Sequence, residues 1–171
     1  MKPDGNGCLA IEQKIRYARE LFSKWGGMLL KDELLNDLLS SLSRGISSSQ
    51  EIMSRVGVVA ACRSCEEEEG GSCCGNGIEN KYNSVLLLIN LLMGQSLPMQ
   101  RFKENSCYFL TPTGCCLQAR HVICVNYICS KLHGSVPLSE LIHLQEVNGQ
   151  ELDTLFILHE NIKRLLTHGH R

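Results

Sequence analysis

The sequence contains few aromatic residues, and its positive and negative charges nearly cancel. Only 5% of its 171 residues are Phe, Trp or Tyr, which leaves little material for platforms on which nucleic-acid bases stack. The 17 Lys and Arg residues against 18 Asp and Glu residues give a formal net charge of −1. Such a chain has no overall field that attracts nucleic acid or an acidic membrane, so we expect neither as a partner.

Long hydrophobic runs are also missing. The most apolar stretch is Val85–Met93, and Asn90 interrupts it. It is about half the length that a membrane-spanning helix needs, which favours a buried helix or strand. Charged residues such as Lys14, Arg16 and Arg19 prevent the N-terminal segment from forming the apolar core of a signal peptide. These absences predict a cytoplasmic protein.

Cysteine, in contrast, is abundant. The chain has ten cysteines, and nine of them lie between Cys62 and Cys129. A cytoplasm keeps thiols reduced, and a chain of this length with 43% hydrophobic residues can build a core without crosslinks. We therefore favour the interpretation that the clustered cysteines are metal ligands. Disulfides remain an alternative, with Cys8 as a tenth partner, and so does simple burial of individual cysteines as small apolar residues.

Apolar residues recur at spacings of three and four on both sides of the cysteine-rich segment, a pattern typical of amphipathic helices. In the N-terminal part we expect one helix that ends at Gly26-Gly27 and a second that ends at Gly45. A third, over about 49–61, would carry Cys62 at its C-terminal end.

Further helices are expected over 80–93, over 116–132 and in the C-terminal part, where Asn148-Gly149 should form a break. Residues 62–79, with four glycines and four consecutive glutamates, should form a loop. A short strand is expected near Cys107 to Leu110.

The predicted fold class is mainly α, with a helical frame around a loop-rich, cysteine-rich metal-binding centre. We expect a single domain over residues 1–171. It would comprise a helical block at 10–61, the cysteine-rich centre at 62–132 and C-terminal helices at 137–168.

The cysteines form two clusters with distinct spacings. The first is Cys62-x2-Cys65-x7-Cys73-Cys74, and the second is Cys107-x7-Cys115-Cys116-x7-Cys124-x4-Cys129. A C-x2-C unit can hold one ion between two thiolates, as in zinc sites and iron–sulfur clusters. Adjacent side chains diverge, so a vicinal pair serves two sites, or one site and the core, better than it chelates one ion.

The second cluster carries the motifs Cys107-Tyr108-Phe109-Leu110, Gly114-Cys115, Arg120 to Cys124, and Tyr127 to Cys129. With the first cluster it resembles the YkgJ-like family of zinc- or iron-chelating domains, whose signature is C-x2-C-x2-C-C followed by four more cysteines. In this chain seven residues, rather than two, separate Cys65 from Cys73. The resemblance implies eight metal ligands: Cys62, Cys65, Cys73, Cys74, Cys107, Cys115, Cys124 and Cys129. The resemblance favours Cys115 over Cys116 as the metal ligand of this vicinal pair.

Other residues near the cysteines are weaker candidates. Arg120 matches the basic position of the family and could offset the charge of a bound cofactor, although a solvated arginine would look the same. His121 could be a mixed ligand, a donor to sulfur or an ordinary packed histidine. The run Glu66–Glu69 could bind a hard cation, but a solvated loop is the simpler interpretation.

Irregular spacing and an excess of sulfur favour an iron–sulfur cluster over zinc. The first functional hypothesis is therefore electron transfer, or cluster-assisted chemistry on a partner protein. The second is a structural zinc module that binds a partner protein. A third, a methyltransferase-like modifying enzyme, follows only from the resemblance, whose best-known relative is a flagellin-lysine methylase. The sequence leaves open whether the protein is an enzyme.

Overall fold

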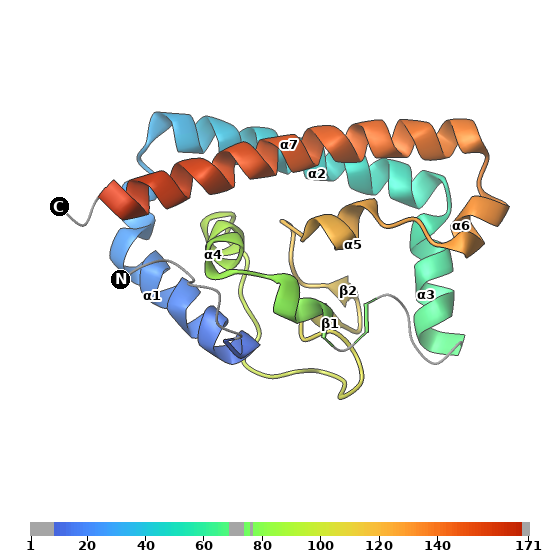
Figure 1. Ribbon diagram of the computed structural model, residues 1–171, viewed down its shortest axis with the longest axis horizontal. Helices are drawn as coiled ribbons and strands as arrows, with labels where there is room; N and C mark the ends of the chain where they lie inside the picture. The colour runs from blue at the N-terminus through green and yellow to red at the C-terminus, as the bar shows by residue number, and fades with distance from the viewer. Residues whose placement is uncertain (1–8, 69–73, 76, 169–171) are drawn as a thin grey trace.

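The computed structural model describes residues 9–68, 74–75 and 77–168, and most of them are helical (Figure 1). The α-helices are α1 (Ile11–Leu29), α2 (Glu33–Arg55), α3 (Val58–Glu68), α4 (Ser84–Leu92), α5 (Val122–Asn126), α6 (Ser130–Ser135) and α7 (Leu138–His168). A short 3-10 helix, η1 (Ile78–Lys81), precedes α4, and the strands β1 (Leu110–Thr111) and β2 (Gly114–Cys115) form an antiparallel pair. The prediction of a mainly α fold is confirmed.

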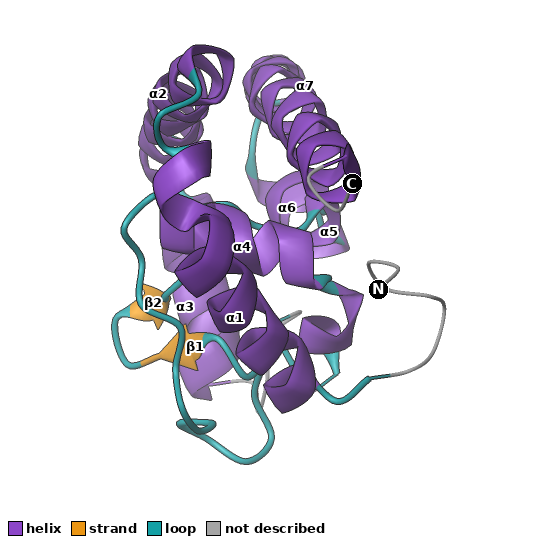
Figure 2. Ribbon diagram, turned by 90° about the vertical axis from the view of Figure 1, so that its left-hand side faces the viewer, coloured by secondary structure: helices purple, strands orange, loops and turns teal. Residues whose placement is uncertain are grey.

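The two longest helices, α2 and α7, lie side by side and run in opposite directions along one edge of the molecule (Figures 1 and 2). Asp32 caps α2, because its carboxylate accepts a hydrogen bond of 3.0 Å from the backbone N–H of Leu35. No helix among the described residues combines the length and apolar character needed to cross a bilayer.

Three of the expected helix breaks are wrong, because each glycine lies inside a helix. α1 continues through Gly26-Gly27, α2 through Gly45 and α7 through Gly149. Each glycine costs about 1 kcal/mol relative to alanine in a helix, which tertiary packing can offset. At Gly45 the reason is visible: a Cβ there would lie only 3.4 Å from the Cα of Glu151, so the glycine permits α7 to approach α2 closely.

The real break lies further along the chain. α2 ends at Arg55 and α3 begins at Val58, with Gly57 between them at φ +84°. Residues that carry a side chain rarely adopt this left-handed backbone conformation, so glycine suits the turn. The expected helix over 49–61 is therefore divided between α2 and α3, and residues 62–68, expected in a loop, are helical.

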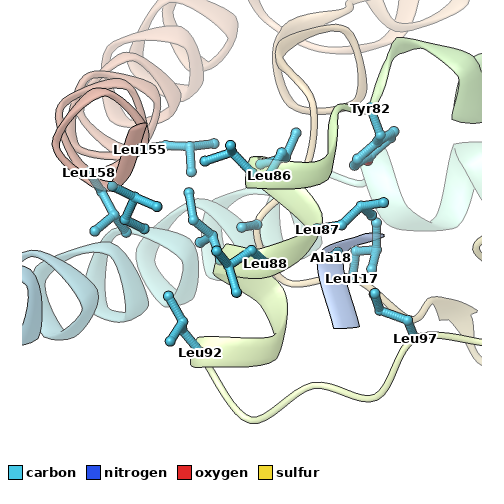
Figure 3. Packing of buried hydrophobic residues seen from close by; sticks show 14 of the residues in the cluster. Ala18, Tyr82, Leu86, Leu87, Leu88, Leu92, Leu97, Leu117, Leu155 and Leu158 are labelled. Carbon is cyan, nitrogen blue, oxygen red and sulfur yellow. The ribbon is translucent and has the colours of Figure 1, made fainter. Parts of the chain in front are cut away.

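Helix α4 forms the middle of the core. Its leucines contact α7 on one side through Leu155 and Leu158, and α1 on the other near Ala18 (Figure 3). Eight of its nine residues are buried, which explains why the stretch is apolar all round rather than striped. The helix begins after Asn83, whose side chain accepts a 2.8 Å hydrogen bond from the Leu86 N–H.

Asn90 is the polar residue that interrupts this apolar helix, and it is completely buried. Its amide nitrogen donates to the carbonyls of Leu86 (3.0 Å) and Ala119 (2.9 Å). Its amide oxygen accepts from the backbone N–H groups of Gln118 (2.9 Å) and Ala119 (3.1 Å). One side chain thus provides hydrogen-bond partners for the backbone of a loop that crosses the core without secondary structure of its own.

The expected helix over 116–132 is wrong, because Asn90 holds residues 118–119 in a non-helical conformation. Two short helices, α5 and α6, follow instead. His121 caps α5, since its Nδ1 atom accepts a 3.3 Å hydrogen bond from the Ile123 N–H. The expected strand shrinks to β1, which starts at Leu110 rather than at Cys107.

Candidate metal centre

Four cysteines from separate segments lie near enough to interact in pairs through their charges, and we call them the inner thiol group. They are Cys74, Cys107, Cys115 and Cys124. The ionised form of Cys107 interacts with Cys74 and Cys124, and that of Cys115 interacts with Cys107. No disulfide joins any two of the eight cysteines that the structure describes.

Backbone pairing brings the two halves of the sequence motif together. Gly75 forms an antiparallel bridge with Ser106, and the Cys107 N–H donates a 2.8 Å hydrogen bond to the Cys74 carbonyl. The β1–β2 hairpin then places Leu110 opposite Cys115. Cysteines that are 33 positions apart in the sequence therefore become neighbours through main-chain contacts alone.

Tyr82 connects the inner thiol group to the core. Its hydroxyl donates to Cys124 Sγ at 3.6 Å and accepts a 3.1 Å hydrogen bond from the His121 N–H. Its ring lies 5.0 Å from the ring of Phe109, and the side chain is almost fully buried. Burial, followed by the charges of Cys124 and Cys115, raises the pKa of Tyr82, so the hydroxyl stays protonated.

Burial also controls the protonation of two thiols in the group. Loss of solvation raises the pKa of Cys107 to about 12 and that of Cys115 to about 12, and neighbouring thiols add to both shifts. When all atoms of Cys115 are taken together, including its backbone, the residue is exposed to solvent. The pKa depends on the atoms around Sγ, and these are largely protein.

Both thiols also interact with the backbone N–H two residues further along the chain. The Phe109 N–H faces Cys107, the Leu117 N–H faces Cys115, and each lowers the pKa of its thiol against the larger effect of burial. N–H groups directed at sulfur favour the thiolate, the form that binds metal. The repeated i to i+2 arrangement is a feature that sequence spacing alone does not reveal.

Two further predicted ligands, Cys62 and Cys65, lie on α3 and form what we call the α3 thiol pair. Their spacing places them on one face of a helix rather than in a tight turn. Lys131 of α6 approaches Cys65, with Nζ 3.6 Å from Sγ. Cys129 stands directly before α6 as its N-cap residue. The α3 thiol pair therefore faces the segment that follows the inner thiol group.

The remaining predicted positions have mixed outcomes. Cys73 lies outside the described residues. Cys116 packs against the core, and burial raises the pKa of its thiol. Across the described ranges, with their gaps at 69–73 and 76, no three His, Cys, Asp or Glu side chains are arranged to hold a metal ion.

The three non-cysteine candidates can be placed as well. The charge of Arg120 lowers the pKa of Cys115, and its Nη2 atom lies 3.7 Å from Met53 Sδ. His121 uses Nδ1 to cap α5, and burial lowers its pKa. Glu66 accepts hydrogen bonds from Lys103 (3.1 Å) and Ser106 (2.9 Å), so this part of the glutamate run attaches α3 to the loop before Cys107.

Sequence reasoning missed four residues that shape this region. They are Tyr82, Glu79, Arg101 and Glu151. Glu79 is buried and forms an ion pair with Arg101, which also donates to the Ser106 carbonyl beside Cys107. Nothing in the spacing of these residues marks them. Their roles come from long-range contacts.

Comparisons of this chain with protein-family models, with curated proteins and with solved structures find no match.

Proposed function

We propose that the protein is a metalloprotein whose inner thiol group binds an iron–sulfur cluster or a zinc ion. The observation that carries this proposal is that Cys107 interacts through its charge with Cys74 and Cys124, and Cys115 with Cys107, although these residues come from separate segments. Thiolates are the preferred ligands of zinc and of iron–sulfur clusters. The resemblance to the YkgJ-like family supports the same conclusion.

The chemistry of this donor set fits a soft cation. Without a cation, the thiols of Cys107 and Cys115, with pKa values of about 12, are neutral at pH 7. Their neighbouring sulfurs repel additional negative charge. A bound cation reverses both effects and displaces the protons, while the two backbone N–H groups already favour thiolate.

Between the two kinds of centre, we favour an iron–sulfur cluster in electron transfer. Cys62 and Cys65 on α3, with Cys129 before α6, provide more sulfur in the same part of the fold than one zinc ion requires. Four protein ligands would leave no open position for a substrate, so a role in passing electrons to a partner protein fits better than catalysis at the metal.

Structural zinc is the second candidate. The inner thiol group contains as many sulfurs as a closed zinc site uses. Such a site would stabilise the loop-rich segment between Cys74 and Cys124 without redox activity.

Anaerobic purification followed by metal analysis and visible absorption spectroscopy tests the proposal. Iron and acid-labile sulfide with a broad visible absorption that bleaches on reduction would support the cluster. A colourless protein with one equivalent of zinc would favour the structural site. A chain that retains neither metal after reconstitution with iron and sulfide, or with zinc, would refute the proposal.

A further inference from the structure

Three polar side chains are buried in the interface between α2 and α7. Ser49 on α2, and Asn148 and Glu151 on α7, are all 0% exposed. A Cβ at Gly45, one turn before Ser49, would lie 3.4 Å from the Cα of Glu151, so the two helices are in close contact at this carboxyl group. The Glu151 side chain is therefore enclosed by protein and has lost its hydration.

These three residues present more hydrogen-bond acceptors than donors. Both carboxyl oxygens of Glu151, the Ser49 hydroxyl and Asn148 Oδ1 have no hydrogen-bond partner in the described part of the chain. The amide nitrogen of Asn148 has one, because it donates a 2.8 Å hydrogen bond to the Val125 carbonyl. An ionised Glu151 would thus set three unpartnered acceptor oxygens against one unpartnered donor, the Ser49 hydroxyl. A proton on Glu151 turns one of these acceptors into a second donor.

The groups that face Glu151 from the other elements do not replace the lost hydration. From α2 it faces the neutral hydroxyl of Ser49, and from the segment before α5 the positive charge of Arg120 acts on it. Arg120 donates no hydrogen bond to the carboxyl group: its Nη2 atom lies 3.7 Å from Met53 Sδ, and its buried Nε has no partner among the residues described. Burial raises the pKa of Glu151 by more than Ser49 and Arg120 together lower it.

We propose that Glu151 is a proton-binding site in the α2–α7 interface, where it is a neutral carboxylic acid in the folded protein and releases its proton when the interface opens. A buried carboxyl group without a hydrogen-bonded partner becomes neutral, because an unsolvated charge costs more free energy than the uptake of a proton. Opening returns the group to water, where it ionises. A rise in pH therefore favours the open interface. The inference does not depend on a metal at the thiols.

The same opening would loosen α5. Asn148, one turn before Glu151, holds the Val125 carbonyl of α5 through its amide nitrogen. Val125 also belongs to a small apolar cluster between the two long helices, together with Ile52, Met53 and Leu144. The proton on Glu151 thus favours both the contact between α2 and α7 and the attachment of α5 to them.

Infrared spectroscopy of the full chain at pH 7 tests the protonation state. The wild type should show the C=O stretching band of a protonated carboxyl group, and Glu151→Gln should lack it. The matched control is Glu146→Gln, which removes an exposed carboxylate from the same helix and should keep the band. Ser49→Ala removes a group that lowers the pKa of Glu151, so the band should persist to higher pH than in the wild type. A wild type without the band at pH 7, or a band that Glu151→Gln retains, overturns the inference.

Urea unfolding between pH 5 and 7 provides an independent measurement. The pKa of Glu151 is higher in the folded state than its ordinary value of 4.5, so its contribution to stability is complete below that pH and declines as the pH rises. The folding equilibrium constant of the wild type, divided by that of Glu151→Gln, should fall by up to about tenfold for each pH unit. The division removes the contribution of His121, which titrates in the same range. A ratio that stays constant contradicts the inference. Should Glu151→Gln not fold, the shift of the band in Ser49→Ala decides the matter.

Discussion

Arg101 and Glu79 form an ion pair that joins the turn before α4 to the loop that leads into Cys107. The Glu79 carboxylate also accepts a 2.8 Å hydrogen bond from the Gly77 N–H, and the guanidinium of Arg101 lies 5.6 Å from the centre of the Tyr108 ring. Glu79 is 2% exposed, whereas the side chain of Arg101 is 23% exposed. The pair therefore anchors the two segments that meet at the Cys74–Cys107 backbone contact.

Arg101→Ala should destabilise the metal-free protein by about 2–4 kcal/mol, because it leaves the Glu79 carboxylate buried and unpaired. Urea unfolding at neutral pH measures the loss. The matched control is Lys103→Ala, which breaks the exposed pair with Glu66 and should cost less than about 1 kcal/mol. Equal losses would show that burial of Glu79 does not decide the energy of its ion pair.

The vicinal pair Cys115-Cys116 offers a second test, through the metal content of two adjacent substitutions. Cys115→Ser should lower metal stoichiometry sharply, since its thiol interacts with Cys107 of the inner thiol group. Cys116→Ser should retain the metal, because that side chain packs against the hydrophobic core. Comparable losses in the two variants would mean that the ligand of this pair is wrongly assigned.

The pH dependence of stability should reveal the raised pKa values of Cys107 and Cys115. Both pKa values rise from the ordinary 9.0 to about 12 on folding, so the folded state holds these protons more tightly than the unfolded state does. The contribution is complete below about pH 9 and is lost as the pH rises towards 12. Urea unfolding of the metal-free protein at several pH values above 8 should show this decline. A Cys107→Ala/Cys115→Ala variant that declines equally would contradict it.

Removal of the Tyr82 hydroxyl should affect the thiol region more than the core. Tyr82→Phe keeps the ring beside Phe109 but leaves the His121 N–H without its acceptor and Cys124 without its donor. We expect a loss of about 1–2 kcal/mol in the free energy of unfolding. Hydrogen exchange at His121 should accelerate, whereas amides in the middle of α4 should not. Uniform acceleration would indicate a general loss of stability instead.

Asn90→Leu should be severely destabilising although it makes α4 more apolar. The substitution removes the side-chain partner of four backbone groups, two carbonyls and two N–H groups, and three of these four hydrogen bonds are buried. The Leu86 carbonyl keeps its helical partner, so the main cost comes from the Ala119 carbonyl and N–H, at about 1–3 kcal/mol for each group left unsatisfied. Thermal unfolding by circular dichroism measures the effect. Asn83→Ala, which removes the cap of the same helix, should cost only about 1 kcal/mol.

The sequence predicts the helical class and the buried stretch around α4 because these depend on periodicity and composition. It fails at Gly45, where the signal for a helix end is overridden by the close packing of α7 at Glu151. It fails again at residues 116–132, because the non-helical backbone there depends on Asn90, a residue about thirty positions away. Local patterns carry no information on either contact.

The candidate site also has a part that the sequence predicts and a part that it does not. The sequence predicts the cysteines as ligands, and the structure brings Cys107 near Cys74 and Cys124 while placing Cys62 and Cys65 on a helix. The charged residues around them, Glu79, Arg101 and Glu151, could not be predicted, because each acts through a partner that is distant in sequence.

Asn90 has a consequence for the proposed metal site. By holding residues 118 and 119, it limits the conformations of the segment between Cys115 and Cys124 before any ion arrives. A flexible chain would lose conformational entropy when a metal gathered these two sulfurs, whereas this segment loses that entropy when the protein folds. The amide of a buried helix thus restricts the segment that carries half of the inner thiol group, which would favour tight binding if this group holds a metal.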